Sequence, residues 1–197
     1  MKKYQDAKKL LFSSSLSGIS EKTISIHYEK LYQGYVKKWQ EIQEKIGGVD
    51  KTSANATFSE IRELKLEESF AANAIILHEA YFDILGGNGN QSGKVVEAIS
   101  NEFGSFEKWQ EEFKALGLSA RGWVVLAYDF NDGRLHNYIC DMHNQGGIWG
   151  AVPILVLDTY EHAYFIDYGS DRKSYIDSFF KNLNWEIINN KFLKVNG

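Results

Sequence analysis

The chain has 197 residues, 44% of them hydrophobic, and a formal net charge of -4 at pH 7. This length suits one globular unit or two small ones that share a core. The acidic total and the lack of a clustered basic stretch argue against nucleic-acid binding, and no apolar run approaches the about 20 residues that cross a membrane. The single cysteine, Cys140, excludes an internal disulfide and a thiolate zinc site. Without a recognisable export signal, we expect a cytoplasmic protein whose metal ligands, if any, are histidines and carboxylates.

Two long amphipathic helices are predicted in the N-terminal half. Residues 20–46 carry apolar side chains every three or four positions and begin at Ser20, a suitable N-cap. Residues 58–85 show the same period and stop at a pair of glycines. The polar segment 49–57 would join the two as an antiparallel hairpin.

One histidine lies on the apolar face of each predicted helix, His27 on the first and His78 on the second. A lone histidine in such a place is most often an ordinary core residue. If the helices pack as a hairpin, however, both imidazoles face one interface. The pair is therefore worth comparing with other possible ligands downstream.

The C-terminal half changes from helical to strand-like patterns. Asn131-Asp132-Gly133 is a hairpin signal between two β-rich runs. The predicted elements are short helices at 94–103 and 106–116, strands at 123–128, 135–140 and 152–157, and a helix at 172–183. The sequence thus predicts an α+β fold: an N-terminal antiparallel helical hairpin domain over residues 1–88, then an α/β domain over residues 89–197 with a three-stranded antiparallel sheet.

Asp158 and His162 follow the third predicted strand, which is almost entirely apolar. A carboxylate at the end of a buried strand is costly unless a cation or another partner compensates it. Together with His27 and His78, these residues offer three imidazoles and one carboxylate. Such a set suits a single first-row metal ion with an open position for solvent or substrate.

The segment from Leu157 to Phe165, LDTYEHAYF, resembles the D-x-W-E-H-A-Y-Y signature of iron/manganese superoxide dismutases. The stretch that starts at His27 and includes Tyr35 is similar to the H-H-x-K-H-H-x-x-Y-V helix of that family. Further agreements occur in order over about residues 17–195, at Phe103-Gly104-Ser105-Phe106, Gly122-Trp123, Val152-Pro153, Arg172 and Asn184-Trp185.

The resemblance implies that one iron or manganese ion per subunit is bound by His27, His78, Asp158 and His162, and that it disproportionates superoxide to oxygen and hydrogen peroxide. It also implies the following roles at the site and the interface: Tyr35 at the substrate gate, Trp123 as a wall of the pocket, and Glu161 as an acceptor for His162 of the partner subunit. A homodimer is therefore expected, with a tetramer as the larger alternative.

Relatives in this family also place a hydrogen-bond donor against the metal-bound solvent. The position on the second helix that supplies it in many relatives is Ala74 here, whose side chain cannot donate. The donor must then come from the loop before the third strand. His143 has the spacing to Asp158 seen in relatives that carry histidine, and Gln145 is the second candidate.

Three positions depart from the family pattern: Leu31 replaces a histidine, Tyr160 a tryptophan and Phe165 a tyrosine. The histidine and the tyrosine bond each other across the dimer interface in the family, so their joint loss orphans no polar group. Leu31 and Phe165 favour one alternative, a catalytically weakened family member that acts as a metal-binding or interaction protein. A zinc hydrolase with the same ligands is another, and it would need a free carboxylate base that the sequence does not offer.

Overall fold

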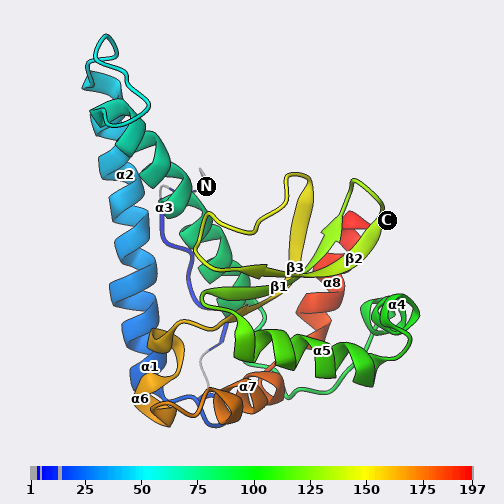
Figure 1. The fold of residues 1–197 in the computed structure, drawn as a ribbon. Helices are drawn as coiled ribbons and strands as arrows, with labels where there is room; N and C mark the ends of the chain where they lie inside the picture. Colours follow the sequence, from blue (N-terminus) through cyan, green and yellow to red (C-terminus); the bar gives the residue numbers. More distant parts are fainter. Residues whose placement is uncertain (1–3, 5, 13–14, 197) are drawn as a thin grey trace.

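The computed structural model describes residue 4 and residues 6–12 and 15–196. Two long helices stand side by side at one edge of the molecule, and their far ends project beyond a small sheet that is flanked by shorter helices (Figure 1). The predicted α+β architecture is confirmed. The N-terminal helical elements are α1 (Glu21–Ser25), the π-helical segment η1 (Ile26–Tyr32), α2 (Gln33–Gly48) and α3 (Glu60–Asp83).

The first long helix is continuous from residue 21 to residue 48 but contains a π-helical segment that the sequence did not predict. Ser20 is the N-cap, as expected, and its hydroxyl accepts a hydrogen bond from the backbone N–H of Thr23 at 3.2 Å. A wider turn of this kind is uncommon and is often found at functional sites. His27 lies within it.

The N-terminal segment ties the two long helices together around Lys8. The hydroxyl of Tyr28 donates to the backbone carbonyl of Lys8 at 2.9 Å, and the backbone N–H of Lys8 donates to the hydroxyl of Tyr32 at 2.7 Å. The ammonium of Lys8 bonds to Asp83, near the end of α3, at 2.5 Å. The segment therefore fixes the spacing of the helices that carry His27 and His78.

The sheet is antiparallel with the order β2-β1-β3, and it comprises β1 (Trp123–Asp129), β2 (Arg134–Cys140) and β3 (Ala151–Asp158). The three predicted strands are confirmed, each slightly longer than expected. Trp123 pairs with Asp158 in the register, so the end of β3 lies beside the start of β1. A shift of register between Leu126 and Ala127 accommodates the region of Pro153, a residue tolerated on an edge strand or at a bulge.

Helices cover the sheet and join it to the hairpin. The predicted helix at 106–116 runs on to residue 119, the predicted helix at 172–183 ends at residue 181, and the last helix was not predicted from its pattern. These elements are α4 (Lys94–Phe103), α5 (Phe106–Ser119), the short turn η2 (Glu161–Ala163), α6 (Phe165–Tyr168), α7 (Arg172–Lys181) and α8 (Trp185–Val195).

One hydrophobic core includes residues from both halves of the chain. Tyr81 of α3, for example, stacks on Phe179 of α7 with ring centroids 5.9 Å apart. The division into domains at residue 88 stays a prediction. No helix among the described residues is both long and apolar enough to span a bilayer.

Candidate metal centre

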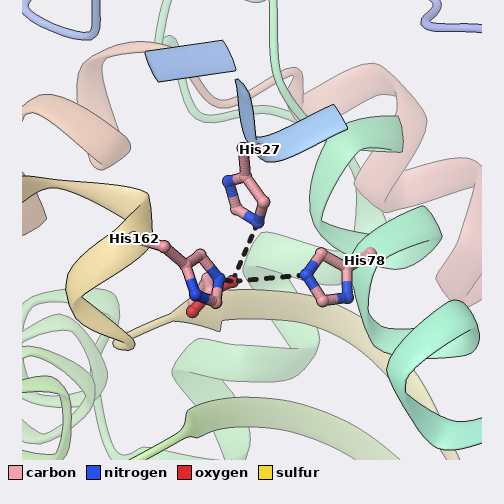
Figure 2. Close-up of side chains that lie close together, drawn as sticks. His27, His78 and His162 are labelled. Carbon is pink, nitrogen blue, oxygen red and sulfur yellow. Dashed lines mark hydrogen bonds and ion pairs between the residues drawn. The ribbon is translucent and has the colours of Figure 1, made fainter. Parts of the chain in front are cut away.

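The four residues predicted as ligands lie together. His27 comes from η1, His78 from α3, Asp158 from the end of β3, and His162 from η2. Figure 2 shows the three imidazoles converging from separate segments. One donor atom from each of the four residues lies within 4.8 Å of all the others. His27, His78 and Asp158 are fully buried, whereas the side chain of His162 is 24% exposed.

A single carboxylate oxygen, Oδ2 of Asp158, lies at the centre of the cluster. It is 3.0 Å from Nε2 of His162, 3.1 Å from Nε2 of His27 and 3.9 Å from Nε2 of His78. Two ligands bound at about 2.1 Å to one ion are about 3.0 Å apart at a right angle and about 4.2 Å apart when opposite. The observed separations fall within that range.

The bonding state of the histidines also fits a metal ion. Among the described residues, neither Nε2 of His27 nor Nε2 of His78 has a hydrogen bond of acceptable geometry, although both are buried. Buried polar atoms are rarely left in this state. A cation shared with Asp158 would satisfy both nitrogens, so the residues present fit a bound iron or manganese ion.

Neighbouring groups hold the ligands in the required orientation. Nδ1 of His78 donates to the backbone carbonyl of Ala74 at 2.6 Å, which leaves the lone pair of Nε2 free. Oδ1 of Asp158 accepts from the backbone N–H of Tyr160 at 2.9 Å, so Oδ2 faces the histidines. The hydroxyl of Tyr175 donates to the backbone carbonyl of Asp158 at 2.8 Å. Sequence reasoning missed this role, because Tyr175 looked like one more apolar residue on its helix.

The charges of the cluster favour metal binding near neutral pH. Burial alone would raise the pKa of Asp158, but His162 and His27 outweigh it and hold this pKa well below its usual range. Burial lowers the pKa of both His27 and His78, so these rings are neutral. Burial also acts to lower the pKa of His162, yet the adjacent charge of Asp158 dominates and raises it.

The raised pKa of His162 predicts a pH dependence of metal uptake. A metal ion can bind only the neutral ring, so protons compete with the ion at this position. Protonation of His162 grows as the pH falls through a pKa above the ordinary 6.5, and the charged ring is then paired with Asp158. We expect the rate of Mn²⁺ uptake by the metal-free protein to fall as the pH is lowered from about 8 to about 6.

Stopped-flow or quench measurements of metal content would give these uptake rates. The control is His136→Ala, which removes a histidine that lies outside the four-ligand cluster, in a separate exposed group with Asp129 and Asp132. This variant should keep the pH profile of the wild type. A rate that stays constant over the whole range would refute the role given to His162.

The other predicted site residues lie around His78. The ring centroids of Trp123, Tyr35 and His143 are 5.0, 5.4 and 5.7 Å from that of His78. His143 is buried, whereas Gln145 is exposed. Of the two loop candidates, the structure therefore brings only His143 to the centre.

Comparison with known proteins agrees with this geometry. Residues 91–191 match the family described as "Iron/manganese superoxide dismutases, C-terminal domain". A protein named "Superoxide dismutase [Fe]" from Aquifex aeolicus is 43% identical over 91% of this chain and 87% of its own length. Another of the same name from Cupriavidus metallidurans is 41% identical over 91% of each chain, and "Superoxide dismutase [Mn] 1" from Halobacterium salinarum is 34% identical over 88% of this chain and 86% of its own. The chain belongs to the iron/manganese superoxide dismutase family.

Proposed function

We propose that this protein is a superoxide dismutase whose single iron or manganese ion is bound by His27, His78, Asp158 and His162. The observation that carries the proposal is the convergence of three imidazole nitrogens on Oδ2 of Asp158, at 3.0 to 3.9 Å, in a buried site. The names of the similar proteins support both the activity and the two metals.

A bound iron or manganese ion would supply one-electron redox chemistry between the +3 and +2 states, which is what the disproportionation of superoxide to oxygen and hydrogen peroxide requires. The chain supplies the surroundings of that exchange. Asp158 contributes the one negative charge among the four ligands, and the packed aromatic rings around His78 limit water access. Reduction of superoxide also consumes protons. Tyr35 and His143 are the candidate proton donors, because both rings contact the ligand His78.

Positive charge near the site would help to attract the superoxide anion despite the acidic total. Lys30 is exposed within the π-helical segment η1. The guanidinium of Arg172 donates to the hydroxyl of Tyr164 at 3.2 Å and to the carbonyl of Ala120 at 2.8 Å, which fixes its position. These two residues are the proposed sources of that charge.

Neither alternative function gains support. A zinc hydrolase would need a carboxylate base beside the open position, but the four-residue cluster at the metal centre contains one carboxylate, Asp158, which is itself a ligand. The second group of possible donors among the described residues, Asp129, Asp132 and His136, is separate from it. A weakened family member without catalysis would be expected to lose part of the ligand set. Here all four donor residues are present and close together.

A homodimer in the cytoplasm is part of the proposal. His162 is partly exposed although it belongs to the cluster, and a second copy would cover it. The buried free thiol of Cys140 is compatible with a reducing compartment. Fractionation of the source cells, with the activity followed in each fraction, would test the location.

Metal analysis combined with a superoxide-decay assay on the purified protein tests the function. We expect about one iron or manganese ion per chain and a decay rate that scales with metal content. Stoichiometric zinc with hydrolase activity would support the first alternative. Metal without any effect on superoxide decay would support the second.

His143→Ala should keep the metal but lose most of the turnover, because His143 contacts the ligand His78 without being a ligand itself. Substitutions of such neighbouring groups typically cost on the order of 10–100-fold in activity. Turnover per metal ion is the quantity to measure. Gln145→Ala is the control, and full activity in His143→Ala with loss in Gln145→Ala would reverse the assignment.

A further inference from the structure

A second group of possible metal ligands lies at the turn between β1 and β2. One donor atom from each of Asp129, Asp132 and His136 lies within 4.8 Å of the other two. Asp129 is the last residue of β1, whereas Trp123, the first, pairs with Asp158 of the metal centre. A strand of seven residues spans about 20 Å from its first residue to its last. The turn therefore lies at the far end of β1 from the metal centre (Figure 1).

The pairing of the hairpin brings the three side chains together. Alternate residues of a strand point to the same face, and residues paired across an antiparallel ladder share a face. His136 pairs with Ala127, which is two residues before Asp129, so His136 and Asp129 lie on the same face. Asp132 reaches this face from the turn, and its Oδ2 lies 2.8 Å from Nε2 of His136. Local pairing thus holds two carboxylates and one imidazole close together.

Asp129 is a buried carboxylate whose hydrogen-bond donors, among the described residues, are all neutral. It is 5% exposed and accepts from the backbone N–H and the side-chain amide of Asn131, at 2.8 and 2.7 Å, and from the hydroxyl of Tyr138 at 2.7 Å. These bonds, above all the one from the backbone of Asn131, keep the pKa of Asp129 below its ordinary value, so the group is charged at neutral pH. The neighbouring Arg134 bonds to Glu102 instead. A buried charge usually has a charged partner or binds a metal ion, and in the part of the chain that the structure describes Asp129 has no ion pair.

The other two side chains of the group are open to solvent. Those of Asp132 and His136 are 44% and 33% exposed. An ion can therefore reach the group without any opening of the fold, and water can fill the remaining positions around it. Because such an ion stays in contact with water, we expect it to bind more weakly and to exchange faster than an ion at the buried centre.

We propose that Asp129, Asp132 and His136 form a second cation site, which binds a first-row divalent ion such as Zn²⁺ and stabilises the fold. An imidazole ligand favours Zn²⁺ over Mg²⁺ and Ca²⁺, and Mn²⁺ binds a given set of ligands more weakly than Zn²⁺. The 2.8 Å between Nε2 of His136 and Oδ2 of Asp132 suits two ligands at about 2.1 Å from one ion and nearly at a right angle. The ion also gives the buried charge of Asp129 a cationic partner. The proposal is independent of the proposed function, because no ligand of the metal centre takes part.

Calorimetric titration with Zn²⁺ tests the site. The protein is first saturated with Mn²⁺, so that the four-ligand centre is occupied. We expect the wild type to take up one further, saturable equivalent of Zn²⁺ per chain. In His136→Ala the affinity for Zn²⁺ should fall by at least the order of 10–100-fold that loss of an outer group costs at a metal site. The absence of saturable binding in the wild type, or an unchanged affinity in His136→Ala, would overturn the proposal.

Two further variants distinguish a built site from a surface that is merely acidic. Asp132→Asn keeps the shape of the side chain but removes its charge, and it should weaken Zn²⁺ binding. The matched control is Glu102→Ala, which removes one negative charge beside the hairpin, from a residue that pairs with Arg134 outside the group. It should leave the affinity for Zn²⁺ unchanged. An equal loss of affinity in both variants would show general attraction by negative charge and would refute the site.

Thermal unfolding gives a second readout. An ion at this site joins the end of β1, the turn and β2, and the amide of Asn131 links the turn to the loop before β3 by donating to the carbonyl of Trp149 at 2.9 Å. A ligand that binds only the folded state raises its stability. Zn²⁺ should therefore raise the melting temperature of the manganese-loaded wild type but leave that of His136→Ala unchanged. Equal shifts in the two proteins would place the bound zinc elsewhere and contradict the proposal.

Discussion

Asp158→Ala is expected to leave the protein without stoichiometric iron or manganese and without measurable dismutase activity. The substitution removes the atom that lies nearest to all three imidazoles, Oδ2, and with it the one negative charge among the four ligands. Three neutral rings would remain to hold a divalent or trivalent ion. Substitution of a group that only supports a ligand lowers metal affinity by at most about 100-fold, and the loss of Asp158 itself should exceed that figure.

His162→Ala should have the same consequence, because only three of the four donors would remain. Metal per chain after dialysis, measured by elemental analysis, decides the result, and circular dichroism shows whether the variant is folded. The control is Asp83→Ala, which removes a partly buried carboxylate that pairs with Lys8 and Lys191 outside the cluster. It should destabilise the protein but keep its metal. Tight stoichiometric metal in Asp158→Ala or His162→Ala would refute the ligand assignment.

The sequence predicted most of what builds the centre. The helical period placed His27 and His78 on buried faces, and the spacing of Asp158 and His162 placed them at one strand end. These signals are local, since they depend on a period of 3.6 residues or on a turn of four residues. The packing that brings the two pairs together was inferred from the expected hairpin and from the family resemblance.

Features that depend on tertiary contact were not predicted. Nothing in the run of residues around His27 distinguishes the π-helical turn from an ordinary α-helix. The last helix, α8 (Trp185–Val195), begins with Asn184 as its N-cap, and this side chain accepts from the backbone N–H of Ile187. That signal is visible in the sequence, but the pattern that follows mixes polar and apolar residues.

The hydrogen-bond directions at the site also lay beyond sequence analysis. The indole of Trp123 can only donate, whereas His143 and Tyr35 can each donate or accept. Which of these atoms lie within hydrogen-bond distance of one another is known only from the folded structure. Likewise, the hydroxyl of Tyr175 contacts the carbonyl of Asp158 only after α7 has packed on the end of β3. Residue type predicted which hydrogen-bond donors and acceptors were available, and packing determined which of them are paired.

Glu161→Ala should weaken both the dimer and the activity. His162 presents Nε2 to Asp158 at 3.0 Å, which leaves Nδ1 for another acceptor at a partly exposed position. Glu161 is exposed beside it, and Phe165 and Ile166 are 54% and 45% exposed on the same short stretch. A two-fold axis at this surface would let each Glu161 accept from His162 of the partner subunit and would bury the apolar side chains.

The loss of that acceptor should affect assembly and catalysis together, because the same contact holds the interface and orients a ligand. We expect a higher dissociation constant in sedimentation velocity and a fall in turnover per metal ion on the order of 10–100-fold. Glu111→Ala, at an exposed glutamate of α5, is the matched control and should change neither quantity. A wild-type protein that sediments as a fully active monomer would rule out the shared contact, because the orientation of His162 would then need no second subunit.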